Sequence, residues 1–161
     1  MAKEIRPVDY HSMMVFGGAA EAAGILGDLT ESGVGLLAFS VLTHNDRVSQ
    51  LDLIPDDIDS LEKAVARLGL HPGERKTGFL IRGLDRPLAM AQVLRRLDEA
   101  HIAVTAVQAV SAGAGRFGAL VRVKPDNFDE AATVLGADEF DRRVLYSIVG
   151  EIPGPQMRSA A

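Results

Sequence analysis

Residues 76–123 read KTGFLIRGLDRPLAMAQVLRRLDEAHIAVTAVQAVSAGAGRFGALVRV. The run Lys76–Gly83 is rich in β-forming residues, and Arg86–Ala100 places apolar side chains at helical spacing. Ile102–Val110 is again rich in β-branched residues, and Phe117–Val123 follows it after a glycine-containing turn. The stretch therefore predicts a strand, a helix and a β-hairpin, in that order.

Local signals mark where these elements begin and end. Asp85 suits the N-cap of the helix, and Pro87 suits its first turn, where a missing N–H does no harm. Residues 112–116 resemble a phosphate loop only faintly, because such a loop opens a helix and this one joins two strands. Further on, Asp126 is expected to open a helix that runs to Leu135, and Arg142–Val149 is expected to be a strand.

An internal repeat extends this pattern to the whole chain. Pro55–Asp59 matches Pro125–Asp129 at an offset of 70, and Gly17 matches Gly83 at an offset of 66. The first copy accordingly predicts elements of the same kinds in the same order. They are strands at His11–Phe16, Gly35–Leu42 and Val48–Ile54 and helices at Ala19–Ser32 and Asp57–Leu68.

The order of elements predicts an α+β fold of two tandem ferredoxin-like βαββαβ units, with antiparallel sheets and helices on one face. We expect the first unit at residues 1–75, the second at 76–150, and a flexible tail at 151–161. Two complete units need eight strands, and the sequence predicts seven. Either the strand before Gly83 serves both units, or the units exchange strands.

Composition excludes several classes of protein. The chain of 161 residues has a net charge of −5 and no cysteine, which rules out disulfides and thiolate metal sites. Basic residues do not outnumber acidic ones, and aromatic residues are only 5%, so nucleic acid is a poor candidate partner. The sequence has no apolar run of membrane-spanning or signal-peptide length, and we expect a cytoplasmic protein.

Three segments carry a resemblance to a known family. Gly83–Leu94, Ala100–Ala106 and Phe117–Pro125 resemble an ACT domain, and the whole chain resembles small bacterial proteins made of two tandem ACT domains. The resemblance implies a non-catalytic regulatory protein that binds an amino acid or a similar small molecule between paired units. It also implies a homodimer and no cofactor.

The resemblance also assigns a ligand site. It uses the loop between the first strand and first helix, together with the second strand. Carried over by position, these residues are Asp85, Arg86, Pro87, Leu88 and Ala89, with Ala103, Val104, Thr105 and Gln108. The family commonly has Gly at Leu88 and Asn at Ala103. These departures support an alternative, a structural or partner-regulating protein whose ligand sites have closed.

Two arginines suggest a second kind of site. The alternation of the strands places Arg82 and Arg122 together on the face that the helices leave open. Paired guanidinium groups suit a carboxylate or phosphate, which would make this face an anion site. The alternative, which we favour, is a salt bridge to Asp52 or a solvated face.

Nothing in the sequence predicts catalysis or metal binding. The four histidines, His11, His44, His71 and His101, lack ligand spacing and are expected to be solvated. The run Asp56–Asp59 and its repeat at Asp126 are best explained as helix caps. No serine has the context of an activated nucleophile. We therefore expect no enzyme activity and no metal.

Overall fold

The computed structural model describes residues 4–45, 47–84 and 87–137; for Leu84, Pro87 and Leu88 it describes the backbone. The expected strand at residues 142–149 and the tail at 151–161 lie outside these residues. The elements, in chain order, are β1 (Glu4–Phe16), α1 (Ala19–Glu31), β2 (Leu36–Asn45), β3 (Val48–Pro55), α2 (Ile58–Arg67), β4 (Glu74–Leu84), α3 (Pro87–Glu99), β5 (Val104–Gly113), β6 (Arg116–Val123), a 3₁₀ turn (Pro125–Asn127) and α4 (Phe128–Leu135).

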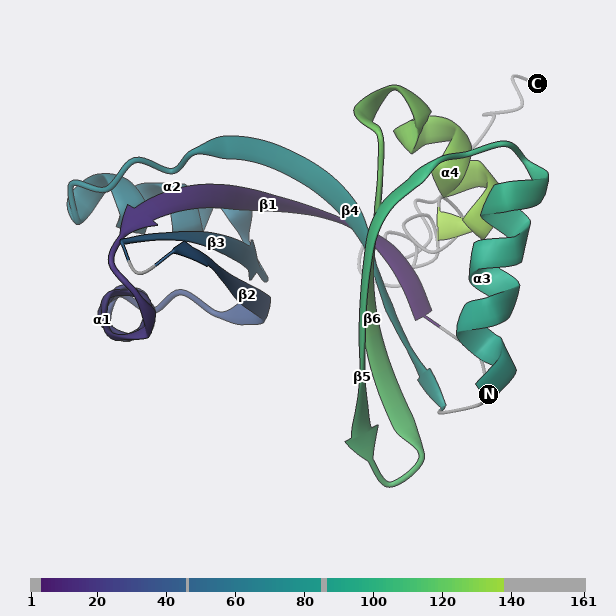
Figure 1. Ribbon diagram of the computed structural model, residues 1–161, viewed down its shortest axis with the longest axis horizontal. Helices are drawn as coiled ribbons and strands as arrows, with labels where there is room; N and C mark the ends of the chain where they lie inside the picture. Colours follow the sequence, from purple (N-terminus) through teal and green to yellow (C-terminus); the bar gives the residue numbers. More distant parts are fainter. Residues whose placement is uncertain (1–3, 46, 85–86, 138–161) are drawn as a thin grey trace, which may run out of the picture.

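The strands form one six-stranded antiparallel sheet in the order β2-β3-β1-β4-β6-β5 (Figure 1). The α+β class predicted from the sequence is confirmed. Strand β4 pairs with both β1 and β6, so the strand before Gly83 serves both sides of the sheet. We call β1, α1, β2, β3 and α2 the first half, and β4, α3, β5, β6 and α4 the second half.

Strand β1 is longer than the sequence suggested, since it begins at Glu4 and not at His11. Pro7 interrupts the β pattern there, because proline lacks the N–H that a central strand needs. The structure tolerates Pro7 because β3 pairs with β1 only from His11 onward. The part of β1 before His11 therefore needs no backbone N–H for a hydrogen bond to β3. This segment lies beside β4, with Ile5 opposite Ile81.

Helices α1, α2, α3 and α4 lie on one face of the sheet, as predicted. Ile5 belongs to the core under α3 and α4, and Met13 belongs to the core under α1 and α2. Both are odd-numbered residues of the same strand, and side chains two apart point to the same side. We call the opposite, helix-free side the bare face.

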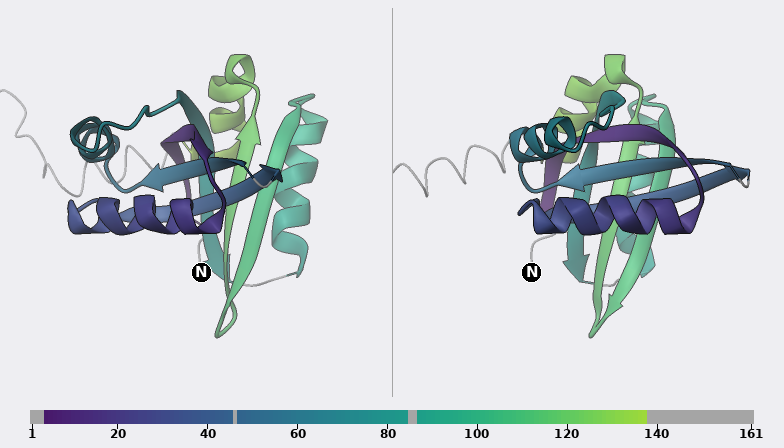
Figure 2. Two further views of the ribbon diagram at one scale, coloured as in Figure 1. Left: turned by 60° about the vertical axis from the view of Figure 1, so that its left-hand side comes forward. Right: turned by 90° about the vertical axis from the view of Figure 1, so that its left-hand side faces the viewer.

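The bare face is nevertheless buried at its centre. Tyr10, Ile54, Leu80 and Leu120 form a cluster there, each no more than 6% exposed. The sheet twists so strongly that β2 and β3 run across the direction of β5 and β6 (Figures 1 and 2). Each half therefore shields the bare face of the other.

The two halves repeat the same strand register. Met13 is opposite Leu51 in the first half, and Phe79 is opposite Val121 in the second. These pairs are related by the offsets of 66 and 70 that the sequence repeat shows. The repeat is therefore a repeat of structure, and corresponding positions can be compared one by one.

The second helix of each half begins differently. The Asp57 carboxylate caps α2 by accepting a hydrogen bond from the Ser60 N–H at 3.1 Å, as predicted. In the second half the prediction was wrong: Asp126 lies in the 3₁₀ turn, and α4 begins at Phe128 without a side-chain cap. The turn between Gly113 and Arg116 joins paired strands, which confirms the hairpin.

Candidate functional site

A carboxylate is buried at the centre of the bare face. Asp52, on β3, is completely buried. Its Oδ1 accepts hydrogen bonds from the Ser12 hydroxyl at 2.6 Å and from the Gln50 amide at 3.0 Å. Its Oδ2 lies 2.8 Å from Nη2 of Arg122, and the Ser40 hydroxyl donates to it at 3.4 Å. Every oxygen of the buried charge is thus satisfied, as burial requires.

Arg122 reaches this carboxylate from β6, in the other half. Its guanidinium lies over the Tyr10 ring, 5.1 Å from the ring centroid, and Nη2 also donates to Oε1 of Gln108 at 3.3 Å. Nε of Arg122 is buried with no hydrogen-bond partner among the described residues. The Asp52–Arg122 pair therefore ties the two halves together across the bare face.

This environment shifts two titrating groups. Burial alone would raise the pKa of Asp52, but the hydrogen bonds from Ser12 and Gln50 and the charge of Arg122 lower it below its ordinary value. Burial raises the pKa of Tyr10, although the charge of Arg122 opposes that shift. Asp52 is accordingly held as a carboxylate and Tyr10 as a neutral phenol.

The structure separates the two arginines that the sequence placed together. The salt bridge from Arg122 to Asp52, favoured over an anion site, is present. Arg82 lies opposite Gly118, so Arg122 is four positions farther along β6. Four residues of a strand span about 13 Å. Both arginines lie on the bare face, but they do not face one another.

A trough opens on the bare face beside Arg82. Its volume is about 300 Å³, and it lies between the edge strands β2 and β5. The lining residues are mainly apolar and come from both halves. They are Leu37, Ala38, Phe39, Ile54, Leu80, Arg82, Gln108, Ala109, Val110, Gly118, Ala119 and Leu120.

Those predicted ligand residues that the structure describes do not come together within one chain. Asp85 and Arg86 lie outside the described residues, and Pro87 and Leu88 open α3 after the end of β4. Leu84 is opposite Arg116, whereas Val104 is opposite Val123. These positions are seven residues apart on β6, or about 23 Å. The end of β4 and the start of β5 are therefore at opposite ends of the second half.

The other residues predicted to bind the ligand lie in three different environments. Ala89 and Val104 pack against the core of the second half. Ala103 and Thr105 are exposed at the start of β5. Gln108 lines the trough.

In the first half, the position equivalent to Ala103 is Gly35, just before β2, and the Asp56 side chain fills the space beside it. A Cβ on Gly35 would collide with Oδ2 of Asp56, so the carboxylate takes the place of a side chain there. The Asp56 N–H also donates to the Gly35 carbonyl at 3.0 Å. A larger residue at position 35 would displace this carboxylate.

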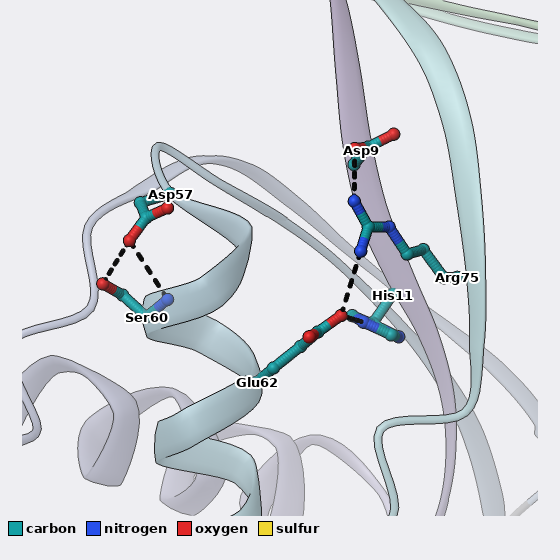
Figure 3. Close-up of polar contacts among 6 residues, drawn as sticks. All are labelled: Asp9, His11, Asp57, Ser60, Glu62 and Arg75. Carbon is teal, nitrogen blue, oxygen red and sulfur yellow. Dashed lines mark hydrogen bonds and ion pairs between the residues drawn. The ribbon is translucent and has the colours of Figure 1, made fainter.

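His11 is the one histidine whose expected solvation was wrong, since it is only 4% exposed. It lies under α2, where Nε2 is 2.9 Å from Oε1 of Glu62 (Figure 3). Arg75 bridges that glutamate and Asp9, with Nη2 2.7 Å from the Asp9 carboxylate (Figure 3). The sequence analysis expected a solvated His11 because it took His11 as the first residue of the strand. In the structure β1 begins at Glu4, so His11 lies inside the strand.

His44, His71 and His101 are exposed, as expected. Within residues 4–45, 47–84 and 87–137, no three His, Asp or Glu side chains are grouped so as to hold a metal ion. In the same part of the chain, no helix combines the length and apolar character needed to cross a membrane.

Comparison with solved structures identifies the fold. BT0572 from Bacteroides thetaiotaomicron superposes with a TM-score of 0.67 and 17% sequence identity, over 84% of this chain and 90% of that one. The regulatory subunit of aspartate kinase from Thermus thermophilus, in its ligand-free form, gives 0.50 and 13% over 84% and 93%. The fold is ACT-like. The alpha and beta subunits of an aspartokinase give 0.51 and 12% over 83% and 90%. No family model matches the sequence, and no curated protein matches it.

The ACT-like fold agrees with the resemblance read from residues 83–125. The trough was not predicted. Two of its residues, Arg82 and Gln108, were singled out, but for different sites. The missing signal was the curvature of the sheet, which brings two edge strands together and which strand patterns do not encode.

Proposed function

We propose that this chain is a non-catalytic regulatory protein that binds an amino acid or a related small metabolite, and that it acts as a homodimer of tandem ACT units. The ACT-like fold, shared with a regulatory subunit of aspartate kinase, supports the proposal. The units correspond to residues 1–75 and 76–150. Fold alone does not fix function, so the ligand must be tested directly.

The geometry of the second half carries the proposal one step further. The end of β4 at Leu84 and the start of β5 at Val104 lie at opposite ends of one unit. Two units that pair head to tail would bring the end of β4 in one unit against the start of β5 in the other. A ligand site built from these residues therefore needs two units, and a homodimer supplies them.

A thermal-shift screen of the full chain against the proteinogenic amino acids tests this function. A ligand at a hundred times its dissociation constant stabilises the native state by about 2.7 kcal/mol. Asp85→Ala should weaken the response, and Asp28→Ala, at an exposed position on α1 of the first half, should not. Sedimentation at the same concentrations should show a dimer, and dilution to monomer should abolish binding.

The alternative is a partner-regulating protein with closed ligand sites. The Asp56 carboxylate beside Gly35 and the exposed apolar residues Phe16 and Met14 favour it. Phe16 is 86% exposed and Met14 is 58% exposed. If no amino acid shifts the unfolding temperature and Leu88→Gly does not create a response, the sensor proposal is wrong and this alternative stands.

A further inference from the structure

The trough differs from the proposed ACT-type site in needing only one chain. Its walls come from both halves of one molecule, and the described residues that line it lie on β2, β3, β4, β5 and β6. Its volume, about 300 Å³, is at the lower end of the range for small-molecule sites. Any occupant must therefore be small.

Most of the trough wall is apolar. Leu80, Ile54 and Leu120 form its floor and are at least 94% buried, while Leu37 and Val110 stand at its sides. Val110 is 68% exposed although it is a large β-branched residue. A ligand with a short hydrocarbon chain or an aromatic ring would cover this surface and remove it from water.

The polar groups of the trough are hydrogen-bond donors. Arg82 has no carboxylate within ion-pair distance among the described residues, and Glu4, its cross-strand neighbour, is not paired with it. Gln108 accepts from Arg122 through Oε1, which leaves the hydrogens of its amide nitrogen to donate. Among the residues that the structure describes, no acidic side chain lines the trough. The described lining thus offers side-chain partners for an anion and no carboxylate for an ammonium group.

We propose that the trough binds a small monocarboxylate with an apolar body and no amino group. The carboxylate pairs with Arg82, whose planar guanidinium suits two parallel hydrogen bonds. The Gln108 amide donates to the same carboxylate, and the hydrocarbon lies on Leu80 and Leu120. Because no acidic side chain is found in the described lining, this ligand differs from an amino acid, and the trough goes beyond the proposed function.

Titration calorimetry with the full chain tests the proposal, using hexanoate and phenylacetate as probes. Both should bind with one site per chain. Hexanol, which lacks the charge, and 6-aminohexanoate, which adds an ammonium group, should bind at least tenfold more weakly. Arg82→Gln should weaken hexanoate binding at least tenfold, with Arg82→Lys between it and the wild type.

The matched control is Arg95→Gln, an exposed arginine on α3, which covers the opposite face of the sheet. It should bind hexanoate like the wild type. Equal affinity of Arg82→Gln and Arg95→Gln, or of hexanol and hexanoate, would overturn the proposal. The proposal would also be overturned if hexanoate did not bind and Val110→Glu lowered the oligomeric state. That result would show that a second copy of the chain fills the trough.

The result of the hexanoate titration can be told apart from the result of the amino-acid screen. Hexanoate binding should survive dilution to monomer and the change Asp85→Ala, both of which remove the site between units. Loss of hexanoate binding on dilution would overturn the trough proposal and leave the amino-acid proposal untouched.

Discussion

The two halves of the molecule share one strand register but differ at corresponding positions on the bare face. Phe16 and Leu42 in the first half occupy the places of Arg82 and Gln108 in the second. Phe16 is 86% exposed and Leu42 is 47% exposed. The first half therefore has exposed apolar side chains at these positions, whereas the second half supplies the two polar side chains of the trough that both halves line.

The same comparison explains how the halves are joined. Asp52 and Arg122 are equivalent positions of the repeat, and they carry opposite charges that meet across the bare face at 2.8 Å. Two identical units would place like charges there, which would repel. Divergence of the repeat is thus what allows the two units to lock together, and it makes the ion pair the first feature to test.

The largest effect is expected from breaking this pair. Asp52→Leu leaves the Arg122 guanidinium buried without a counter-ion, since its side chain is only 14% exposed. The loss should be about 3–5 kcal/mol in the free energy of unfolding, measured by urea denaturation. The double variant with Arg122→Met should regain most of it. A double variant no more stable than Asp52→Leu would contradict this account, and Arg75→Met, at an exposed pair, should cost at most about 1 kcal/mol.

A matched pair of substitutions compares the two ends of the bare face. Leu80 and Met14 are equivalent positions, but Leu80 is 6% exposed and Met14 is 58% exposed. Leu80→Ala should cost about 2–3 kcal/mol, because it opens a cavity under the trough. Met14→Ala should change stability by less than about 0.5 kcal/mol. Similar costs in urea denaturation would show that the two ends are equally packed.

The pH dependence of stability follows from Asp52. Its pKa is lower in the folded protein than in the unfolded chain, so its contribution is present above the unfolded value and is lost as the pH falls through the folded one. The unfolded value is about 3.9. The difference in unfolding temperature between the wild type and Asp52→Leu should be constant from pH 7 to about pH 5 and shrink below pH 4. A difference that persists at pH 2 would point to packing and not to the charge.

Sequence reasoning predicted what depends on local pattern. Alternation along the strands placed Arg82 and Arg122 on the face that the helices leave open, and they lie there, while Phe79 and Val121 belong to the core under the helices. The ion pair from Arg122 to Asp52 followed from the same alternation applied to the repeat. The separation of Arg82 from Arg122 did not follow, because alternation fixes the face of each side chain but not which residues of two neighbouring strands lie opposite each other.

Longer-range features depended on the tertiary structure. Strand β1 extends back to Glu4 because β4 offers it an edge, which overrides the break suggested by Pro7. His11 is buried because α2 packs over it, and the trough exists because the sheet curves. None of these is a property of a segment considered alone.

The smallest effect concerns the start of the second helix in each half. Asp57 caps α2 through the Ser60 N–H, whereas Asn127, at the corresponding place before α4, makes no side-chain cap. Asp57→Ala should lower the free energy of unfolding by about 1 kcal/mol, because it leaves an N–H of the first turn unsatisfied. Asn127→Ala should change it by only a few tenths of that, since no bond is lost. Equal losses from the two changes would show that the cap is not what fixes the start of α2, and that the 3₁₀ turn before α4 holds its helix as firmly by other contacts.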